Sequence, residues 1–395
     1  MIMNRERIMQ VQQALLEAEL DAIVCRLPEN VLFLSGYYSL TGFSFVFFPV
    51  NHDPVLIIYE PELPYTSKSW ITDIRTFGWA LRGDGDPYQS VSRFFTDISR
   101  TMGLKTIGYE AGFESAAPPH MSGEPLLPSA STVRMYKKAL PDAKWVDATD
   151  ILYTLRKNKT SYELEMIRLA NEVATFGLEA FYQGLIPGKT EAELSAEVEA
   201  AIFSRGTGYK KTQSARGWAE VMSGPENSAQ AYRMFLISTN RPLEKGDLVL
   251  LELGTVADGY WSDLTRTGVV GKPNQQQLDI WQVVMDAQNA AVKKMVAEGE
   301  ACEVDLAAYS IIEKAGYGKY YPHFTGHGLG FRYHEPYPSL RADNAGELLE
   351  VGMVSSIEPG IYIKGVGGIR IEDNIAVYPD GPKYLSIFPK TLEKP

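Results

Sequence analysis

The stretch Tyr321-Pro-His323-Phe-Thr-Gly-His327-Gly-Leu-Gly-Phe-Arg-Tyr-His334-Glu-Pro contains three of the five histidines of the chain, all within twelve residues. Histidine is the commonest side-chain metal ligand, and it exchanges protons near neutral pH. Glycines interrupt the stretch, and glycine allows the backbone conformations that tight loops require. A scarce residue type gathered in one glycine-rich segment indicates a functional site and not an ordinary surface.

Acidic residues lie in short β-like runs on both sides of this segment. Glu252 and Asp263 precede it, whereas Glu358 and Glu372 follow it. If four carboxylates share one pocket, they raise each other's pKa values and cannot all stay ionised without compensation. Two divalent ions would neutralise them, with His327 adding a neutral nitrogen, and Mn²⁺, Zn²⁺, Co²⁺ or Fe²⁺ suits such a donor set. Protonated carboxyls or a cationic substrate would be the alternatives.

Composition narrows the class of protein. The 395 residues exceed what one hydrophobic core usually organises, so two domains are expected. The formal net charge of −11 argues against nucleic acid as a partner. No segment approaches the ~20 apolar residues of a membrane span, so no membrane association is expected. Cys25 and Cys302 are far apart and fit a reducing compartment, which makes the cytoplasm the expected location.

The first domain is expected over residues 1–155, where helix-like and strand-like runs alternate. This alternation is typical of an α/β domain built around one sheet. A helix is predicted near residues 89–102. The buried strands are predicted at residues 21–26, 31–36, 43–48, 54–59 and 106–109.

The second domain is expected over residues 156–395. Thr160 or Ser161 is a candidate N-cap, with Glu163 in the first turn of the long helix that follows. Helices are predicted at residues 161–183, 190–205, 275–299 and 304–315. Strands are predicted over residues 249–270, and the histidine segment and the two glutamate strands complete the chain.

These motifs resemble the M24 metallopeptidase family, which includes methionine aminopeptidase, aminopeptidase P and prolidase. The whole chain resembles the two-domain branch that also contains creatinase. The family pattern is an acid, a second acid eleven positions later, a His in Gly-His-Gly, a Glu in Glu-Pro-Gly and a Glu in Arg-x-Glu-Asp. The matching residues here are Glu252, Asp263, His327, Glu358 and Glu372. The resemblance implies a creatinase/prolidase-like α/β N-terminal domain and an α+β catalytic domain of the pita-bread fold.

The resemblance also implies roles for single residues. The five matched residues would bind two divalent ions, and a hydroxide between the ions would attack the substrate. Glu358 would be both a ligand and the general base. His323 and His334 match histidines that contact the substrate and the tetrahedral intermediate, and Arg370 matches an arginine that lies behind the ligands. Arg370 and Tyr232 are also expected among the substrate-binding residues. Arg266 is expected to orient the strand of Asp263 and not to touch substrate. A homodimer is expected by the same resemblance.

Two positions depart from the family pattern. The first acid is usually Asp, and Glu252 carries one more methylene, which moves its carboxylate outward by about a bond length. Peptidases of this branch usually carry a His shortly after a Gly-Pro-Asn segment, where this chain has Gly224-Pro-Glu-Asn-Ser-Ala-Gln-Ala-Tyr232. Tyrosine, with a pKa near ~10, donates a hydrogen bond but is a poor proton shuttle at neutral pH.

Three functions follow from this pattern. The leading hypothesis is a metal-dependent hydrolase that cleaves an amide bond in short peptides of the Xaa-Pro type, with His334 or Tyr232 polarising the substrate carbonyl. The first alternative is a creatinase-like or ectoine-hydrolase-like enzyme that opens a C–N bond in a small cationic metabolite, where Glu252 would act without metal. The second alternative is a catalytically silent binding protein on the same fold. Metal content separates the first two, and turnover separates both from the third.

Overall fold

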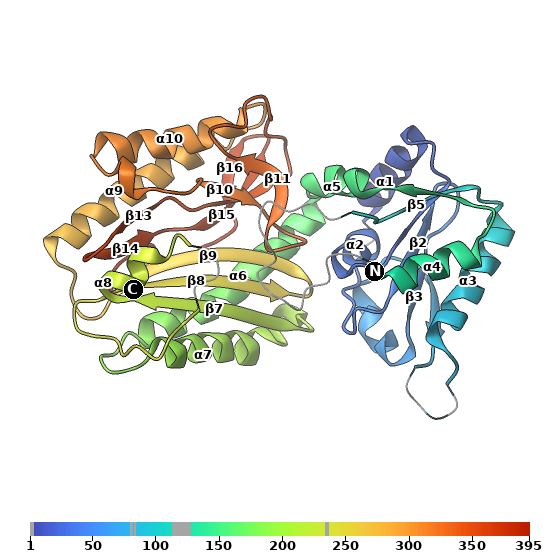
Figure 1. Ribbon diagram of the computed structural model, residues 1–395, viewed down its shortest axis with the longest axis horizontal. Coiled ribbons are helices and arrows are strands. Elements are labelled where there is room, and N and C mark those ends of the chain that lie inside the picture. The colour runs from blue at the N-terminus through green and yellow to red at the C-terminus, as the bar shows by residue number, and fades with distance from the viewer. Residues whose placement is uncertain (1–3, 80–81, 83, 113–127, 234–236) are drawn as a thin grey trace. The chain divides into compact units, whose positions relative to one another are not determined.

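The computed structural model describes residues 4–79, 82, 84–112, 128–233 and 237–395, which form two compact units. Among these residues, the first unit extends to Arg156 and the second from Lys157 to Pro395. Figure 1 shows a separate sheet structure in each unit. No helix in the described ranges is long and apolar enough to cross a membrane.

A six-stranded mixed sheet forms the centre of the N-terminal unit. Its strands are β1 (Ala22–Cys25), β2 (Phe45–Pro49), β3 (Val55–Tyr59), β4 (Asp73–Phe77), β5 (Thr106–Tyr109) and β6 (Lys144–Asp147), in the order β4-β3-β2-β1-β5-β6. The helices are α1 (Arg5–Glu17), α2 (Pro28–Ser35), α3 (Pro87–Met102), α4 (Ala130–Ala139) and α5 (Thr149–Lys157), with a 3-10 segment at Glu60–Lys68. Phe95 of α3 and Tyr136 of α4 pack against Phe45 of β2, so both helices bury an apolar face against the sheet.

The prediction of a strand at residues 31–36 is wrong, because this segment belongs to helix α2. Pro28 occupies the first turn, where its missing N–H is harmless, and Gly36 ends the helix with a φ of 71°. Every residue from Glu29 to Ser35 is buried, so the helix is covered on all sides and its run 31–34 lacks helical periodicity. A short continuous apolar run is the pattern that cannot separate a buried strand from a buried helix.

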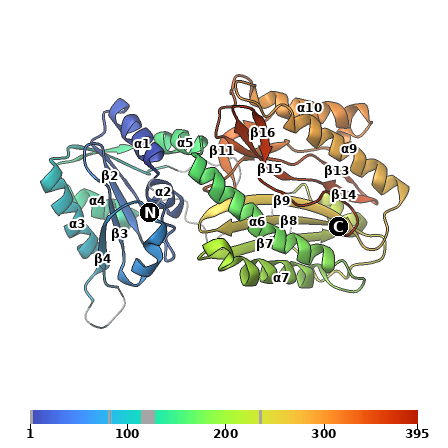
Figure 2. The same cartoon turned by 180° about the vertical axis from the view of Figure 1, so that it is seen from behind.

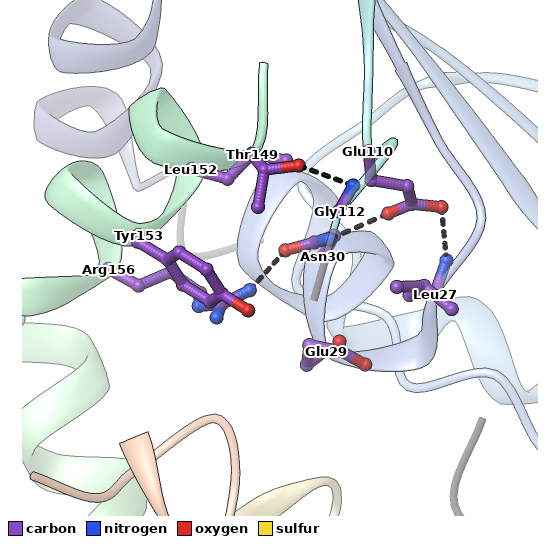
Figure 3. A pocket seen from close by; sticks show the side chains of 9 residues that line it. All are labelled: Leu27, Glu29, Asn30, Glu110, Gly112, Thr149, Leu152, Tyr153 and Arg156. Atoms are coloured by element: carbon purple, nitrogen blue, oxygen red, sulfur yellow. Dashed lines mark hydrogen bonds between the residues drawn. The ribbon is translucent and has the colours of Figure 1, made fainter. Parts of the chain in front are cut away.

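Glu110 links three elements of the N-terminal unit (Figure 3). It follows β5, and its carboxylate accepts hydrogen bonds from the backbone N–H groups of Arg26 and Leu27 and from the side-chain amide of Asn30. Arg156 of α5 donates in turn to Asn30 Oδ1. Burial raises the pKa of the Glu110 carboxyl to about 7, against the effect of these donors. The network ties β5, α2 and α5 together.

The C-terminal unit has two strand layers with helices outside them (Figure 1). The first layer contains the sheet of β7 (Ala215–Ser223), β8 (Leu248–Ala257) and β9 (Tyr260–Val269), with helices α6 (Ser161–Gln183), α7 (Glu191–Ala201) and α8 (Gly224–Asn227). The second contains β10 (Gly326–Gly328), β11 (Glu335–Leu340), β12 (Val354–Ile357), β13 (Gly360–Ile363), β14 (Gly367–Arg370), β15 (Asp373–Tyr378) and β16 (Gly381–Tyr384), with helices α9 (Gln275–Val292) and α10 (Ala301–Lys314).

Packing places these layers face to face. Helix α6 crosses the three-stranded sheet, as Figure 2 shows, and α7 packs on β7. The five-stranded sheet has the order β11-β10-β12-β15-β16, and β13 pairs with β14. Strand β14 contacts β8 and β9, and β15 contacts β9, so the inner surfaces of the two layers meet. Polar side chains carried on those inner strands therefore point toward one another.

Several helix boundaries can be compared with the sequence patterns. Helix α6 begins at Ser161 after a capping box of Thr160 and Glu163, as predicted. The helix predicted to reach residue 205 ends as an α-helix at Ala201 and continues as a single π turn, Ile202–Gly206. The third predicted helix is shorter than expected, since α9 ends at Val292.

Candidate metal-binding active site

Glu252 and Asp263 lie on neighbouring antiparallel strands of the first layer. Glu252 pairs with Thr265, and Asp263 pairs with Gly254, two positions along β8 from Glu252. Residues two apart on a strand share a face, so both carboxylates point toward the second layer. Gly254 leaves room for the ring of Tyr333, because a Cβ there would come within 2.8 Å of that ring.

His327 lies in the middle of β10, between β11 and β12. A Cβ on Gly326 would collide with the Ser356 backbone, and one on Gly328 would collide with the Tyr337 backbone. The Gly-His-Gly motif thus permits close approach of three strands. His327 Nδ1 lies 2.9 Å from the Gly328 carbonyl oxygen, which makes Nδ1 the protonated nitrogen and leaves Nε2 with a lone pair. Burial lowers the pKa of His327, which favours the neutral ring that metal ions bind.

The last two acids complete the cluster from the second layer. Glu358 directly follows β12, and its backbone N–H donates to the Thr325 carbonyl. Glu372 lies between β14 and β15, and its backbone carbonyl accepts a hydrogen bond of 2.6 Å from Arg266. Arg266 also forms a buried ion pair of 2.7 Å with Asp373. Arg266 lies on β9, the strand of Asp263 that it was expected to orient, and its contacts fix the backbone at Glu372 and Asp373, a link that the sequence analysis did not foresee.

These side chains approach each other closely. His327 Nε2 lies 3.3 Å from Asp263 Oδ2 and 3.6 Å from Glu358 Oε1. Three sets of ligand atoms lie within 4.8 Å of one another, namely those of Asp263, His327 and His334, of His327, Glu358 and Glu372, and of Glu252, Asp263 and Glu372. The five residues named from the sequence are therefore brought together, and His334 joins them.

One buried oxygen shows that this cluster fits a cation. Glu372 is fully buried, and its Oε2 accepts a hydrogen bond from Thr265, whereas its Oε1 has no hydrogen-bond partner among the described residues. Leaving a buried carboxylate oxygen without a partner is costly unless a cation lies beside it. Oxygen-rich donors with one neutral imidazole suit divalent ions of the first transition row. The residues present therefore fit the divalent metal that the sequence pattern implies.

Protein donors already surround Glu252. Arg370 forms an ion pair with Glu252 Oε2, which also lies 2.9 Å from the Thr265 hydroxyl. The Tyr333 hydroxyl is hydrogen-bonded to Glu252 Oε1 and lies 2.8 Å from Asp263 Oδ1. Each carboxylate oxygen has two lone pairs, so Glu252 retains fewer of them for a metal than Glu372 does.

His323 and Arg370 meet at a tyrosine that the sequence analysis did not single out. The Tyr362 hydroxyl lies 2.9 Å from His323 Nε2 and accepts a hydrogen bond of 3.1 Å from Arg370 Nη1. Burial lowers the pKa of His323 to about 4, so this ring is neutral at physiological pH. Tyr232 packs edge-on against Tyr362, with ring centroids 5.5 Å apart. Tyr232 and Tyr362, the hydrogen-bond partner of His323, thus form one aromatic side of the site, called the aromatic wall below.

His334 lies beside His327, with ring centroids 4.3 Å apart at a nearly perpendicular angle. Its position follows from Glu335, which begins β11 and forms a buried ion pair of 2.9 Å with Lys159. The Tyr333 ring also lies against the His334 ring, with centroids 4.6 Å apart. The structure thus brings His334 to the cluster, in reach either of a metal or of a substrate carbonyl.

Burial and mutual repulsion set the charge state of the carboxyls. Burial raises the pKa of Asp263, and the nearby charge of Glu372 raises it further. Glu358 has its pKa raised by burial, then by Glu372 and Asp263. Burial also raises the pKa of Glu220, on β7, to about 7. These carboxyls need added positive charge to be ionised together at neutral pH.

Sequence reasoning missed Thr265, Tyr333, Tyr362 and Glu220. Tyr333 stands inside the quoted histidine segment, next to His334, and Tyr362 lies four residues after Glu358, so adjacency was an available signal. Finding Glu220 requires the register of β7 on β8, which the sequence does not reveal.

Comparison with known proteins identifies the class. The family model of metallopeptidase family M24 matches residues 165–379, and that of the creatinase/prolidase N-terminal domain matches residues 7–157. The chain belongs to metallopeptidase family M24, whose members depend on divalent metal, and it carries the creatinase-type N-terminal domain. The predicted fold class and the prediction of an M24-family hydrolase are confirmed.

Individual relatives match over nearly the whole chain. The putative dipeptidase YkvY of Bacillus subtilis is 32% identical, covering 98% of this chain and 99% of the relative. The Xaa-Pro dipeptidase of Pyrococcus horikoshii is 31% identical, covering 98% and 97%. Among solved structures, the Xaa-Pro dipeptidase of Bacillus anthracis superposes with a TM-score of 0.78 at 27% identity, and the prolidase of Pyrococcus horikoshii with 0.76 at 28%, each covering 98% of this chain and 99% of the other.

Proposed function

We propose that this protein is a metal-dependent peptidase that cleaves the amide bond before proline in short peptides. The observation that carries the proposal is the unpartnered Glu372 Oε1 within a cluster of four carboxylates and His327. Relatives named Xaa-Pro dipeptidase support the choice of substrate. Their names favour this function over the metal-free hydrolase and the silent binding protein.

The metal ligands we propose are Glu252, Asp263, His327, Glu358 and Glu372, holding two divalent ions of manganese, cobalt, zinc or iron. When bound, such ions polarise the substrate carbonyl and activate water for attack. The contacts of the ligands support a larger share of the metal binding for Glu372 than for Glu252. Arg370 and Tyr333 already contact Glu252, whereas one oxygen of Glu372 has no hydrogen-bond partner among the described residues.

The other residues bind and orient the substrate. Glu358 is 16% exposed at its side chain, which suits it to take a proton from the attacking water and pass it to the leaving amine. His334 donates a hydrogen bond to the substrate carbonyl as negative charge develops, and Tyr232 does so from the aromatic wall. His323 contacts the substrate and holds the Tyr362 hydroxyl in place. Arg370 acts through Glu252 and Tyr362, which it holds in place.

The wider setting is part of the proposal. We place the domain boundary between residues 155 and 156, and we propose a cytoplasmic homodimer with no nucleic-acid or membrane partner. The two free, buried cysteines support a reducing compartment. The net charge of −11 supports the absence of nucleic acid.

A substrate screen of three proteins tests the function. The metal-supplemented wild type, Tyr232→Phe and Tyr232→His are assayed with Xaa-Pro dipeptides, Xaa-Pro-Yaa tripeptides and cationic cyclic or guanidino metabolites. We expect the wild type to cleave an Xaa-Pro peptide, with kcat lowered roughly 10²–10³-fold in Tyr232→Phe, as for the loss of one oxyanion donor. Tyr232→His should retain cleavage. A wild type inert to every peptide but active on one metabolite would overturn the proposal.

A further inference from the structure

Glu220 is an acidic side chain at the site for which the metal cluster gives no role. It lies on β7 directly opposite Glu252 on β8. Residues paired in this way on antiparallel strands point to the same face, with Cβ atoms about 5 Å apart. The Glu220 carboxylate therefore faces the layer that carries the other acids, and its electrostatic influence reaches Asp263, Tyr333 and Arg370.

The protein provides no bonded counter-charge for Glu220. Within the described ranges, its carboxylate has neither a hydrogen bond nor an ion pair. Arg370 is the cation whose charge acts on it, but the N–H groups of Arg370 are directed to Glu252, Thr265, Tyr362 and a backbone carbonyl. Like charges directly opposite on neighbouring strands destabilise a sheet. The described part of the chain therefore supplies no cation that bonds to Glu220, and a positive partner has to come from outside it.

Glu220 does not complete a metal site. The three groups whose ligand atoms lie within 4.8 Å of one another, searched over the described residues, do not include it. Its side chain is partly exposed, unlike the fully buried Glu372, so a group entering from solvent can reach it. The partner expected for Glu220 is therefore a cationic group that binds and leaves as part of the substrate.

Charge counting leaves room for one ammonium group beside Glu220. Glu220, Glu252, Asp263, Glu358 and Glu372 carry five negative charges when ionised, and Arg370 carries one positive charge. Two divalent ions would balance the remaining four, and transfer of a proton from water to Glu358 leaves this total unchanged. The ammonium and the carboxylate of a dipeptide cancel each other, so the ammonium can pair with Glu220 without adding net charge to the site.

We propose that Glu220 binds the free amino terminus of the peptide substrate, an inference that rests on the proposed function. The α-ammonium nitrogen lies two bonds from the carbonyl carbon of the same residue, a distance of about 2.5 Å. This short reach matches a carboxylate placed one strand away from Glu252. A Lys or Arg side chain of the substrate would carry its charge several bonds further out. The hydrogen bond between ammonium and carboxylate is charge-assisted and thus strong enough to select the substrate.

The test uses two ligands that differ only in the ammonium group, Ala-Pro and propionyl-proline. Both are assayed with the metal-supplemented wild type, with Glu220→Gln, and with Glu226→Gln as the matched control. Glu226 is an exposed residue of α8 and undergoes the same chemical change outside the site. We expect Glu220→Gln to raise the KM for Ala-Pro roughly 10- to 100-fold, as for a lost charged hydrogen bond, and to change kcat less.

The control measurements make the inference falsifiable. The inhibition constant of propionyl-proline and the metal content should be unchanged in Glu220→Gln, and Glu226→Gln should behave as the wild type. An equal effect on both ligands, a loss of metal, or an effect confined to Lys-Pro and Arg-Pro would overturn the inference. If the wild type cleaves no Xaa-Pro peptide, the proposed function fails, and calorimetric binding of the same pair decides about Glu220. Ala-Pro binding that Glu220→Gln does not weaken, or no binding at all, then overturns it.

Discussion

Two buried glutamates, one in each unit, differ in what surrounds their oxygens. Glu110 and Glu372 are 1% and 0% exposed. Both oxygens of Glu110 accept hydrogen bonds, from backbone N–H groups and from Asn30. Glu372 is held at one oxygen by Thr265, and the other has no hydrogen-bond partner in the part of the chain that the structure describes. The difference teaches that burial alone does not mark a ligand, whereas a buried oxygen without a donor beside other potential ligand atoms points to one.

The largest effect is expected from Glu372→Gln. The amide has no negative charge, so it cannot balance a cation as the carboxylate does, and metal-dependent charge stabilisation of several kcal/mol is lost. We expect turnover to fall at least ~10³-fold, with most of the bound metal released on gel filtration. Elemental analysis and a peptide assay measure both effects. Glu110→Gln is the control, because it removes an equally buried charge that has protein donors. Equal metal content in Glu372→Gln and Glu110→Gln would contradict the assignment of Glu372 as a metal ligand.

A second expectation concerns Glu358, the acid proposed to carry the proton. Glu358→Gln keeps an oxygen that can face the metal, but an amide cannot take up a proton at neutral pH. We expect kcat to fall roughly 10²–10⁴-fold while much of the metal and the fold is retained. Single-turnover assays alongside elemental analysis separate the two effects. A kcat within tenfold of the wild type would assign the proton transfer to another group.

The smallest effect is expected from Glu110→Gln, and it depends on pH. The pKa of Glu110 is raised from 4.5 to about 7 by burial, so the folded state holds this proton more tightly than the unfolded state. The stabilising contribution of the proton is complete below pH 4.5 and is lost as the pH rises through 7. Glutamine does not ionise. The free energy of unfolding of the wild type relative to Glu110→Gln should therefore fall by up to about 3 kcal/mol over this range.

Urea unfolding followed by circular dichroism between pH 4.5 and 8 measures this difference. Glu110→Gln serves as the reference for the wild type, because the two proteins share all other titrating groups. Curves of stability against pH that run parallel for the two proteins would show that Glu110 keeps its ordinary pKa in the folded state.

The sequence predicted the elements whose patterns are local. The capping residues Thr160 and Glu163 and the apolar periodicity of α6 located the start of the second unit's first helix. The run at residues 31–36 failed because its side chains are buried all round, which removes the periodicity that distinguishes helix from strand. Local patterns therefore succeed where one face of an element is exposed.

The candidate site was predictable to the extent that it depends on motifs. The five proposed ligands come together as their motifs suggested. Glu220 and Thr265 were missed because each meets Glu252 only through strand register, and register depends on the long-range pairing of β7, β8 and β9. Tyr333 was missed because its hydroxyl reaches Glu252 across the space that Gly254 leaves, a packing relation between residues far apart in the chain.

The metal content of the wild-type protein tests the central claim most directly. Elemental analysis after gentle supplementation with a divalent metal and removal of the excess gives the number of ions per chain. Four carboxylates, His327 and the unpartnered oxygen of Glu372 predict about two ions per chain. Well under one ion per chain, together with activity that strong chelators leave unchanged, would contradict the account.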